Sequence, residues 1–196
     1  MLRKILLIAT AALMIAGTAA AQDNMLDNPS FEDGFDPWTG YGTATLSIDN
    51  ERAYEGSASL RAVVAEAGAN FWDSGIQYKP EGLSFDAGTL HTWAFFAQSD
   101  PPVEINIKPE KAADPWTGYG AKVVNLTADW MEYWVEYTPD EDVSPASLTL
   151  HVAFEPSTIW LDHVRWYHGE YVSGELQTNV EPQGKAAAVW GSLKAR

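Results

Sequence analysis

The chain has no cysteine among its 196 residues, so it can form no disulfide and carry no lipid on a cysteine. Outside the cell, a domain without disulfides must be stabilised by its core, in some proteins with the help of a metal. Basic residues are also scarce: 12 Lys and Arg stand against 27 Asp and Glu, a formal net charge of −15. This charge disfavours nucleic acid and anionic lipid as partners. It suits calcium, which takes oxygen ligands, although acidity also serves solubility alone.

Catalytic signatures are missing as well. The sequence has no GxSxG, no HExxH and no glycine loop of the kind that cradles phosphate. Its four histidines, at positions 91, 151, 163 and 168, do not have the spacing of metal ligands. Paired carboxylates, the minimum for a glycosidase, can occur in so acidic a chain, but no pattern locates them. We therefore expect a protein that is not an enzyme.

The only long apolar run is at the N-terminus. Arg3 and Lys4 precede LLIATAALMIAGTAA at 6–20, which is rich in Ala, Thr and Gly, and Ala19, Ala20 and Ala21 supply a small-residue cleavage pattern. A membrane span needs about 20 strongly apolar residues, whereas a small-residue site after a short run is typical of a signal peptide. We predict a signal peptide at 1–21 and a secreted protein, extracellular or periplasmic, whose mature chain is not inserted in a membrane. An uncleaved anchor is the alternative.

About 175 residues remain after this segment, which is an ordinary size for one domain. Two of the 12 basic residues are lost with the signal, so 10 remain against 27 acidic ones, a charge of −17. We predict one domain at 22–172. The residues at 173–196 lose the alternation of the domain and become rich in Gln, Ala and Gly. We expect this tail to be a linker with a short terminal motif, AVWGSLK, which could attach to a partner chain or a surface, act as a sorting signal, or form a short helix that docks on the sandwich.

The domain itself consists of short runs that alternate with a period of two and are separated by Gly, Pro, Asp and Asn. Such runs predict β-strands, and hardly any window has a helical period. Eight to ten strands without helices predict an all-β sandwich or jelly roll. The clearest runs are 43–49, 58–64, 90–98, 103–109, 121–127, 131–138, 147–154 and 158–166.

The same alternation assigns side chains to faces. In 147–154, Leu148 and Leu150 share the core face, and His151 lies on the other. In 90–98, Gln98 and Trp93 lie on opposite faces of the strand. We expect four tryptophans to be structural, namely Trp93, Trp130, Trp160 and Trp166.

The heptapeptide DPWTGYG occurs twice, at 36–42 and 114–120. Pro followed by Gly is typical of turns, so the pattern predicts the same loop built twice, each presenting a Trp and a Tyr. The alternative is two similar turns whose aromatic side chains pack onto the core.

Several blocks together resemble the carbohydrate-binding module superfamily of families four, nine, sixteen and twenty-two. The most specific are NPSFE at 28–32 and LDHV at 161–164, and the resemblance extends over 24–166. It departs from the family where His163 replaces an acidic or amide residue and where His91 replaces an aromatic residue. The further matching blocks are YEGSASLRA (54–62), NFWDSGIQY (70–78), GTLHTWAFFAQS (88–99) and LTADWMEYWVEYT (126–138).

The resemblance implies a jelly-roll β-sandwich of two antiparallel sheets with a structural calcium near the chain ends. Carried over to this sequence, it places Glu32 and Asp162 as carboxylate ligands, with backbone carbonyls near Ser30 and Glu55 completing the shell. A hard cation with oxygen ligands could tie the first strand to the last. The alternative is that these carboxylates only accept hydrogen bonds.

The resemblance also implies that poly- or oligosaccharide binds on a concave face. Flat aromatic rings suit the C–H face of a sugar, and amides or hydroxyls suit its rim. Trp72 falls where many members place a stacking aromatic, and Trp116 and Tyr119 lie in the second DPWTGYG copy. By face assignment, Gln77, His151 and Gln98 are the expected polar contacts.

We therefore predict a secreted, non-catalytic carbohydrate-binding module. The alternatives are a structural or adhesive domain without a glycan ligand and, less favoured by the residues, a jelly-roll glycoside hydrolase or lyase.

Overall fold

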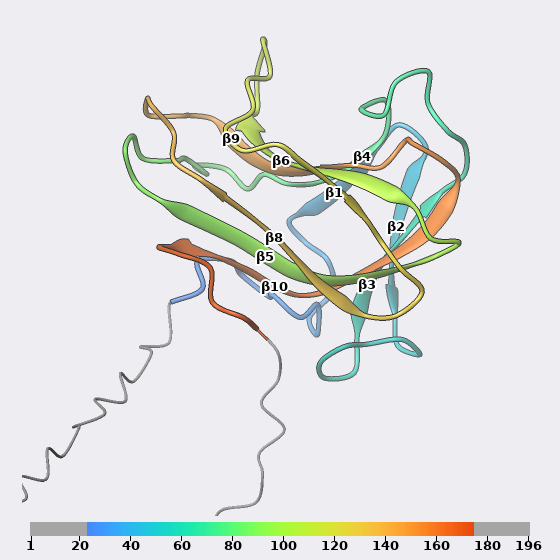
Figure 1. Cartoon of the computed structure of the whole chain (residues 1–196). Helices are drawn as coiled ribbons and strands as arrows, with labels where there is room; N and C mark the ends of the chain where they lie inside the picture. Colours follow the sequence, from blue (N-terminus) through green and yellow to red (C-terminus); the bar gives the residue numbers. More distant parts are fainter. Residues whose placement is uncertain (1–22, 175–196) are drawn as a thin grey trace, which may run out of the picture.

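The computed structural model of the protein describes residues 23–174. Within this range the chain forms ten strands and no helix, in two facing sheets (Figure 1). The predicted signal peptide and residues 175–196 of the predicted tail lie outside the described residues. The strands are β1 (Trp38–Tyr41), β2 (Ala44–Asp49), β3 (Ser59–Val64), β4 (Gly75–Tyr78), β5 (His91–Asp100), β6 (Glu104–Lys111), β7 (Lys122–Asn125), β8 (Met131–Tyr137), β9 (Ala146–His151) and β10 (Ser157–His168).

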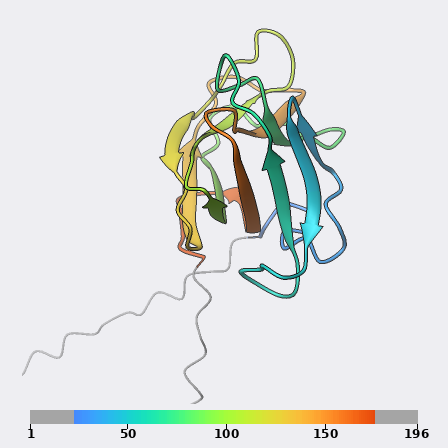
Figure 2. The same ribbon diagram turned by 90° about the vertical axis from the view of Figure 1, so that its right-hand side faces the viewer.

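The first sheet has the order β1-β4-β9-β6-β7 and the second the order β2-β3-β10-β5-β8, and all pairings are antiparallel. Figure 2 shows the domain from the side, with β2 and β3 running next to each other. Most connections cross from one sheet to the other, so each sheet collects strands that are distant in sequence. The predicted fold class, an all-β jelly-roll sandwich of two antiparallel sheets, is confirmed.

The eight predicted runs correspond to β2, β3 and β5 to β10, with ends that differ by a few residues. Strands β1 and β4 were not predicted. Each has only four residues, too few for alternation to be recognised, and β1 lies inside the first DPWTGYG copy, whose composition indicates a turn. No described part of the chain forms a helix that could cross a membrane.

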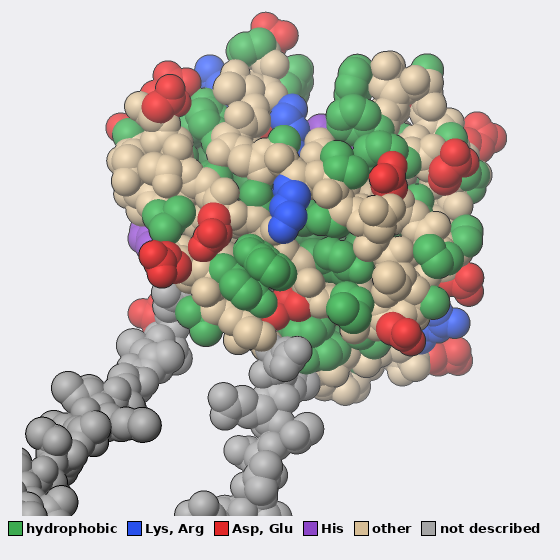
Figure 3. Space-filling model, viewed as in Figure 1, with side chains coloured by type: hydrophobic (Ala, Val, Ile, Leu, Met, Phe, Trp, Pro, Cys, Tyr) green, Lys and Arg blue, Asp and Glu red, His purple; other side chains and the backbone are tan. Residues whose placement is uncertain are grey.

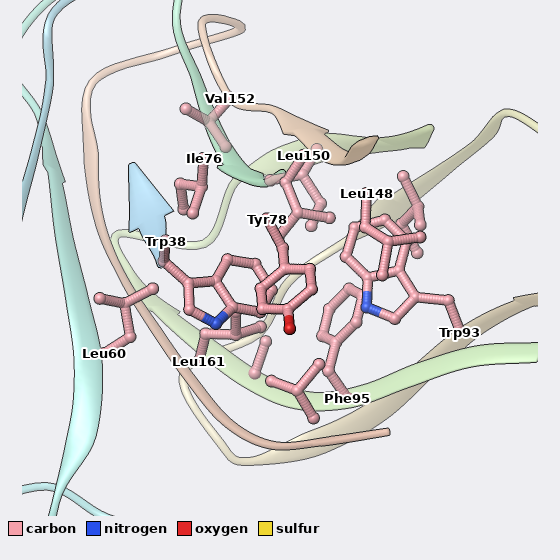
Figure 4. Close-up of a cluster of buried hydrophobic side chains, with 14 of the residues drawn as sticks. Trp38, Leu60, Ile76, Tyr78, Trp93, Phe95, Leu148, Leu150, Val152 and Leu161 are labelled. Atoms are coloured by element: carbon pink, nitrogen blue, oxygen red, sulfur yellow. The ribbon is translucent and has the colours of Figure 1, made fainter. Parts of the chain in front are cut away.

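The core lies between the two sheets. Fully burying one large aliphatic or aromatic side chain stabilises the fold by about 1.5–3 kcal/mol, so the alternating residues of facing strands supply most of the stability. Trp38 packs against Phe31 and Tyr78, with ring centroids 5.8 and 5.2 Å away. Figure 4 shows how the inner side chains of the two sheets meet: Trp38, Ile76, Tyr78, Leu148 and Leu150 from one, and Leu60, Trp93, Phe95 and Leu161 from the other.

The tryptophans expected to be structural are mostly buried. Trp93 and Trp166 belong to the core, and Trp160 is buried on the outer side of β10. Trp130 is only partly buried, just before β8. Burial therefore confirms the structural prediction for Trp93, Trp160 and Trp166, and for Trp130 it stays a prediction.

Candidate functional site

The outer face of the first sheet is polar because its strands alternate. Ile76, Leu150 and Ile107 point into the core, so their neighbours along each strand point outward. The register aligns these outward residues in rows across the sheet. One row is Tyr41, Gly75, His151 and Asn106, and the next is Thr39, Gln77, Thr149 and Lys108.

A cleft of about 710 Å³ lies over this face. Its floor includes Gln77, His151 and Asn106, and its walls include Trp72 and Trp116. The space-filling view shows a notch between two lobes, with apolar side chains on its walls and a histidine and basic groups toward its base (Figure 3). The fold of the described residues therefore leaves a broad opening over the β1-β4-β9-β6-β7 sheet.

The two indoles of the walls come from different loops. Trp72 lies in the connection between β3 and β4, and Trp116 in the connection between β6 and β7. Each is 50% exposed although both are large apolar side chains. Phe71 braces Trp72 with an edge-on contact at 4.7 Å and stacks in turn on Phe154 at 5.0 Å. Both indoles thus offer an open face to the cleft.

Tyr41 continues the wall beside Trp72. Its ring lies over Gly75, where an added Cβ would come within 2.4 Å of the ring, so this close approach requires glycine. The Tyr41 hydroxyl donates a hydrogen bond to the Trp72 carbonyl at 3.2 Å. Burial, followed by the nearby charges of Glu110 and Asp73, raises the pKa of Tyr41 far above its usual range, so the phenol stays neutral.

The floor is uncharged where the rows of amides and hydroxyls meet. Gln77 donates to the Thr149 hydroxyl at 3.2 Å, and the Asn106 amide lies 3.3 Å from Nδ1 of His151. Burial, followed by the charge of Lys108, lowers the pKa of His151 to about 4. The imidazole is therefore neutral at pH 7.

Lys108 fixes the loop that carries Trp116. Its ammonium lies 2.8 Å from the buried carboxylate of Glu110 and donates to the Trp116 carbonyl, also at 2.8 Å. Gly118 passes so close that an added Cβ would lie 2.8 Å from Cε of Lys108. The ion pair therefore cancels a charge in the cleft and anchors one aromatic wall.

The two DPWTGYG copies do not build the same loop, and that prediction is wrong. In the first copy Trp38 is buried and Tyr41 lines the cleft. In the second copy the roles are exchanged: Trp116 lines the cleft, whereas Tyr119 packs against the core. The first copy contains β1 and follows its alternation, while the second lies in a connection between strands.

Four of the six predicted glycan contacts meet in the cleft: Trp72, Trp116, Gln77 and His151. The other two do not. Tyr119 is half-buried and donates its hydroxyl to Glu141 at 3.0 Å. Gln98 is on β5 in the second sheet. Outward residues of the two sheets point in opposite directions, so Gln98 faces away from the cleft and lines a different hollow.

Sequence reasoning missed several residues of the cleft. Asn106, Lys108 and Glu110 alternate with the core-facing Ile105 and Ile107 on β6, so the strand pattern already contained the signal for them. Tyr41 was indicated only by the prediction that each DPWTGYG copy presents a Tyr, and Phe71 had no comparable signal, since its place depends on how the β3–β4 connection folds.

The four predicted calcium ligands gather around the loop at 54–58. Buried Asp162 accepts backbone hydrogen bonds from Tyr54, Glu55 and His163 at 2.7–3.0 Å. Desolvation raises the pKa of Asp162. The loop therefore tethers β10 to the connection between β2 and β3.

The other carboxylates are engaged in the same way. Glu32 accepts from both the amide and the hydroxyl of Ser57, which lowers its pKa. Glu55 contacts His163 Nδ1 at 2.5 Å and the Ser30 hydroxyl at 2.9 Å. The oxygen chemistry suits calcium, but within 23–174 no three His, Asp or Glu side chains form a group that could hold a metal. In this arrangement the oxygens face hydrogen-bond donors, and calcium stays a prediction.

Comparison with known proteins bears on what such a cleft does. The family model described as "Carbohydrate binding domain" matches residues 23–158. No curated protein sequence matches the chain.

Several solved structures have the same fold. The xylan-binding domain CBM22-1 of Xyn10C from Paenibacillus barcinonensis is 18% identical, with 79% of this chain and all of that one covered and a TM-score of 0.61. A structure named "CBM4 structure and function" is 24% identical, with 73% and 99% covered and a TM-score of 0.57. The N-terminal cellulose-binding domain of β-1,4-glucanase C from Cellulomonas fimi is 18% identical, with 72% and 95% covered and a TM-score of 0.55. At these identities the likeness is one of fold alone.

Proposed function

Because the chain belongs to the carbohydrate binding domain family (CBM_4_9), we propose that it is a secreted, non-catalytic module that binds poly- or oligosaccharide in the cleft of the β1-β4-β9-β6-β7 sheet. One observation carries this proposal above the others. Two indoles, on Trp72 and Trp116, are each half-exposed at a cleft whose floor consists of amides, hydroxyls and a neutral imidazole.

The arrangement suits a pyranose ring on physical grounds. An exposed indole face removes the apolar C–H face of a sugar from water, and it does so with little loss of side-chain entropy. The hydroxyls at the edge of the ring need donors and acceptors, which Gln77 and Asn106 both provide. A cleft that is open over the sheet accepts a chain rather than only its end.

The charge of the floor favours a neutral glycan. Lys108 is paired with Glu110, and His151 carries no charge at pH 7, so the floor carries little net charge, and the exposed Lys79 adds one positive charge to the lining. The names of similar structures mention binding of xylan and of cellulose. We take neutral β-1,4-linked xylan and glucan as the first ligands to test.

The test is binding of the mature chain to soluble and insoluble polysaccharides, by affinity electrophoresis and calorimetry. A sugar that covers one indole face removes roughly 100 Å² of apolar surface from water, worth about 2 kcal/mol. Trp72→Ala should therefore weaken binding roughly 30-fold, and Trp116→Ala should act similarly. Trp134→Ala is the matched control, because Trp134 is on β8 in the other sheet, where it stacks on Tyr171.

The outcomes separate the alternatives. Equal binding by the Trp72, Trp116 and Trp134 variants would remove the cleft from the proposal. A mature chain that binds none of a broad glycan panel would favour the structural or adhesive domain. Release of sugar products would favour a hydrolase or lyase.

A structural calcium at Glu32 and Asp162 is part of the proposal and rests on the oxygen chemistry of the cluster. Binding would require Glu32 and Asp162 to exchange their present donors for the ion, with backbone carbonyls near Ser30 and Glu55 completing the shell. Chelation should then lower the melting temperature and added calcium should restore it. Identical melting with chelator and with calcium would leave the cluster as a set of hydrogen bonds.

Secretion is also proposed, with export to the cell exterior or periplasm. Mass spectrometry of the exported protein should find a mature N-terminus at about Gln22. Retention of residues 1–21 on a membrane fraction would favour the anchor instead.

The tail at 173–196 would then be tested for attachment to a partner chain or surface by comparing the full chain with one truncated after Gly174.

A further inference from the structure

A second hollow lies on the outer face of the other sheet, away from the cleft. It has a volume of about 480 Å³. The connection between β2 and β3 borders it with Glu51 and Arg52, strand β5 contributes Gln98 and Asp100, and Trp130 closes it from the segment before β8. None of these residues takes part in the cleft described above.

Gln98 is the most informative residue of this hollow. Its neighbour Ala97 points into the core, so Gln98 points outward, opposite Trp160 on β10. The residue is 7% exposed, and its side chain makes no hydrogen bond within the described part of the chain. Its amide atoms are not among the fully buried polar atoms that lack partners, so the amide opens into the hollow. This amide lines the hollow, so a molecule in the hollow could supply the missing partners.

The walls around Gln98 are held in place by packing. The Arg52 guanidinium lies over the Trp160 ring, 4.3 Å from its centroid. Trp130 packs against Tyr54 with centroids 6.1 Å apart, and Tyr54 stacks on Phe96 at 3.7 Å. The hollow is therefore formed before any ligand arrives.

The chemistry of the lining limits what could bind. Glu51 and Asp100 disfavour an anion, and Arg52 in the same hollow disfavours a lone cation. A volume of about 480 Å³ is far larger than an ion needs, since one water occupies about 30 Å³ of liquid. The carboxylates accept from hydroxyls, the amide both donates and accepts, and the Trp130 indole offers an apolar surface.

We propose that this hollow is a second saccharide site, which takes one neutral sugar unit with its hydroxyls on Gln98, Asp100 and Glu51 and an apolar edge on Trp130. The proposal takes from the proposed function only its class of ligand. The size of the hollow suits a terminal or branching sugar unit, whereas the open cleft suits a chain. Two sites on opposite sheets of one module would let it bridge neighbouring glycan chains and raise its avidity for an insoluble polysaccharide.

The test uses the mature chain labelled with ¹⁵N, in which side-chain amide and indole signals report each site separately. The probes are xylose, glucose, mannose, galactose, xylotriose and cellotriose. A variant with both Trp72→Ala and Trp116→Ala removes the cleft. In this background the sugars should still shift the signals of Gln98 and Trp130.

Gln98→Met keeps the size of the side chain but removes its hydrogen bonds, and Gln77→Met is the same change on the floor of the cleft. Gln98→Met should weaken binding in the second hollow at least tenfold, whereas Gln77→Met should leave it unchanged. Asp100→Asn, at an exposed residue, gives an independent reading if Gln98→Met folds poorly, and it should weaken binding several-fold.

The results that would overturn this inference differ from those that would show that the cleft does not bind sugar. If sugars shift Trp72 in the unmutated chain and never Gln98 or Trp130, only the cleft binds. If calcium chloride alone shifts Gln98 and Trp130 and sugars do not, the hollow is a cation site. If neither site responds to any sugar, both proposals fail.

Discussion

His91 lies in the core in a position that makes the fold sensitive to acid. The residue is 1% exposed, and its ring is stacked between Tyr137 and Trp166, with centroids 5.1 and 5.7 Å away. Neither ring nitrogen makes a hydrogen bond of ordinary geometry. Burial, together with His168, lowers the pKa of His91 from 6.5 to about 4, and the opposing influence of Asp86 does not cancel this.

The sign of the effect follows from the two states. Between pH 6.5 and about 4 the unfolded chain binds a proton at this histidine and the folded chain does not, so the free energy of unfolding falls as the pH is lowered. From pH 7 to pH 4.5 the loss is about 2 kcal/mol for one histidine. His151, whose pKa is also lowered to about 4, adds a similar loss. Together they amount to a large part of the 5–15 kcal/mol of an ordinary domain.

The perturbation is His91→Phe, which keeps a ring between Tyr137 and Trp166 and removes the ionisation. The assay is urea unfolding followed by tryptophan fluorescence at half-unit steps from pH 7.5 to pH 4.5. The variant should lose about 2 kcal/mol less than the parent over this range. His151→Gln should recover a similar amount, and the double variant should be the least sensitive to pH.

An unchanged pH dependence in His91→Phe would refute the reasoning, because a buried neutral imidazole must resist protonation. Greater stability at every pH without a change in slope would show better packing and leave the titration unsupported. The raised pKa of Asp162 acts in the opposite direction, because the folded chain binds this proton more readily than the unfolded chain. It reduces the loss of free energy of unfolding at the lowest pH values equally in parent and variant.

Three further changes test how the cleft and the chain ends are held. Gly75→Ala places a Cβ within 2.4 Å of the Tyr41 ring and should weaken glycan binding several-fold in titrations, whereas unchanged affinity would mean that Tyr41 is no part of the wall. Lys108→Met leaves Glu110 buried and unpaired and should lower the free energy of unfolding in urea by about 3 kcal/mol. Glycan binding should also weaken, because Trp116 loses its anchor. A urea midpoint equal to that of the parent would contradict the ion pair. Asn24→Ala removes hydrogen bonds from the first described residues to β10 and should cost about 1–3 kcal/mol, and no loss would show that these bonds are not needed.

The sequence by itself determined the fold class and much of the inside. Alternation in 147–154 was enough to place Leu148 and Leu150 in the core and His151 outside, because side chains of a strand point to opposite faces. The same rule on β6 would have placed Asn106, Lys108 and Glu110 on the outer face.

Only the tertiary structure decided which outward residues meet. Gln77 and Gln98 are both outward residues of strands, but they belong to different sheets, and sheet membership depends on pairings between distant segments. Identical heptapeptides likewise place Trp38 in the core and Trp116 at the cleft, since one contains a strand and the other lies in a connection. Local sequence fixes the alternation of side chains, whereas long-range pairing fixes which faces are brought together as a cleft and which are left to form the second hollow.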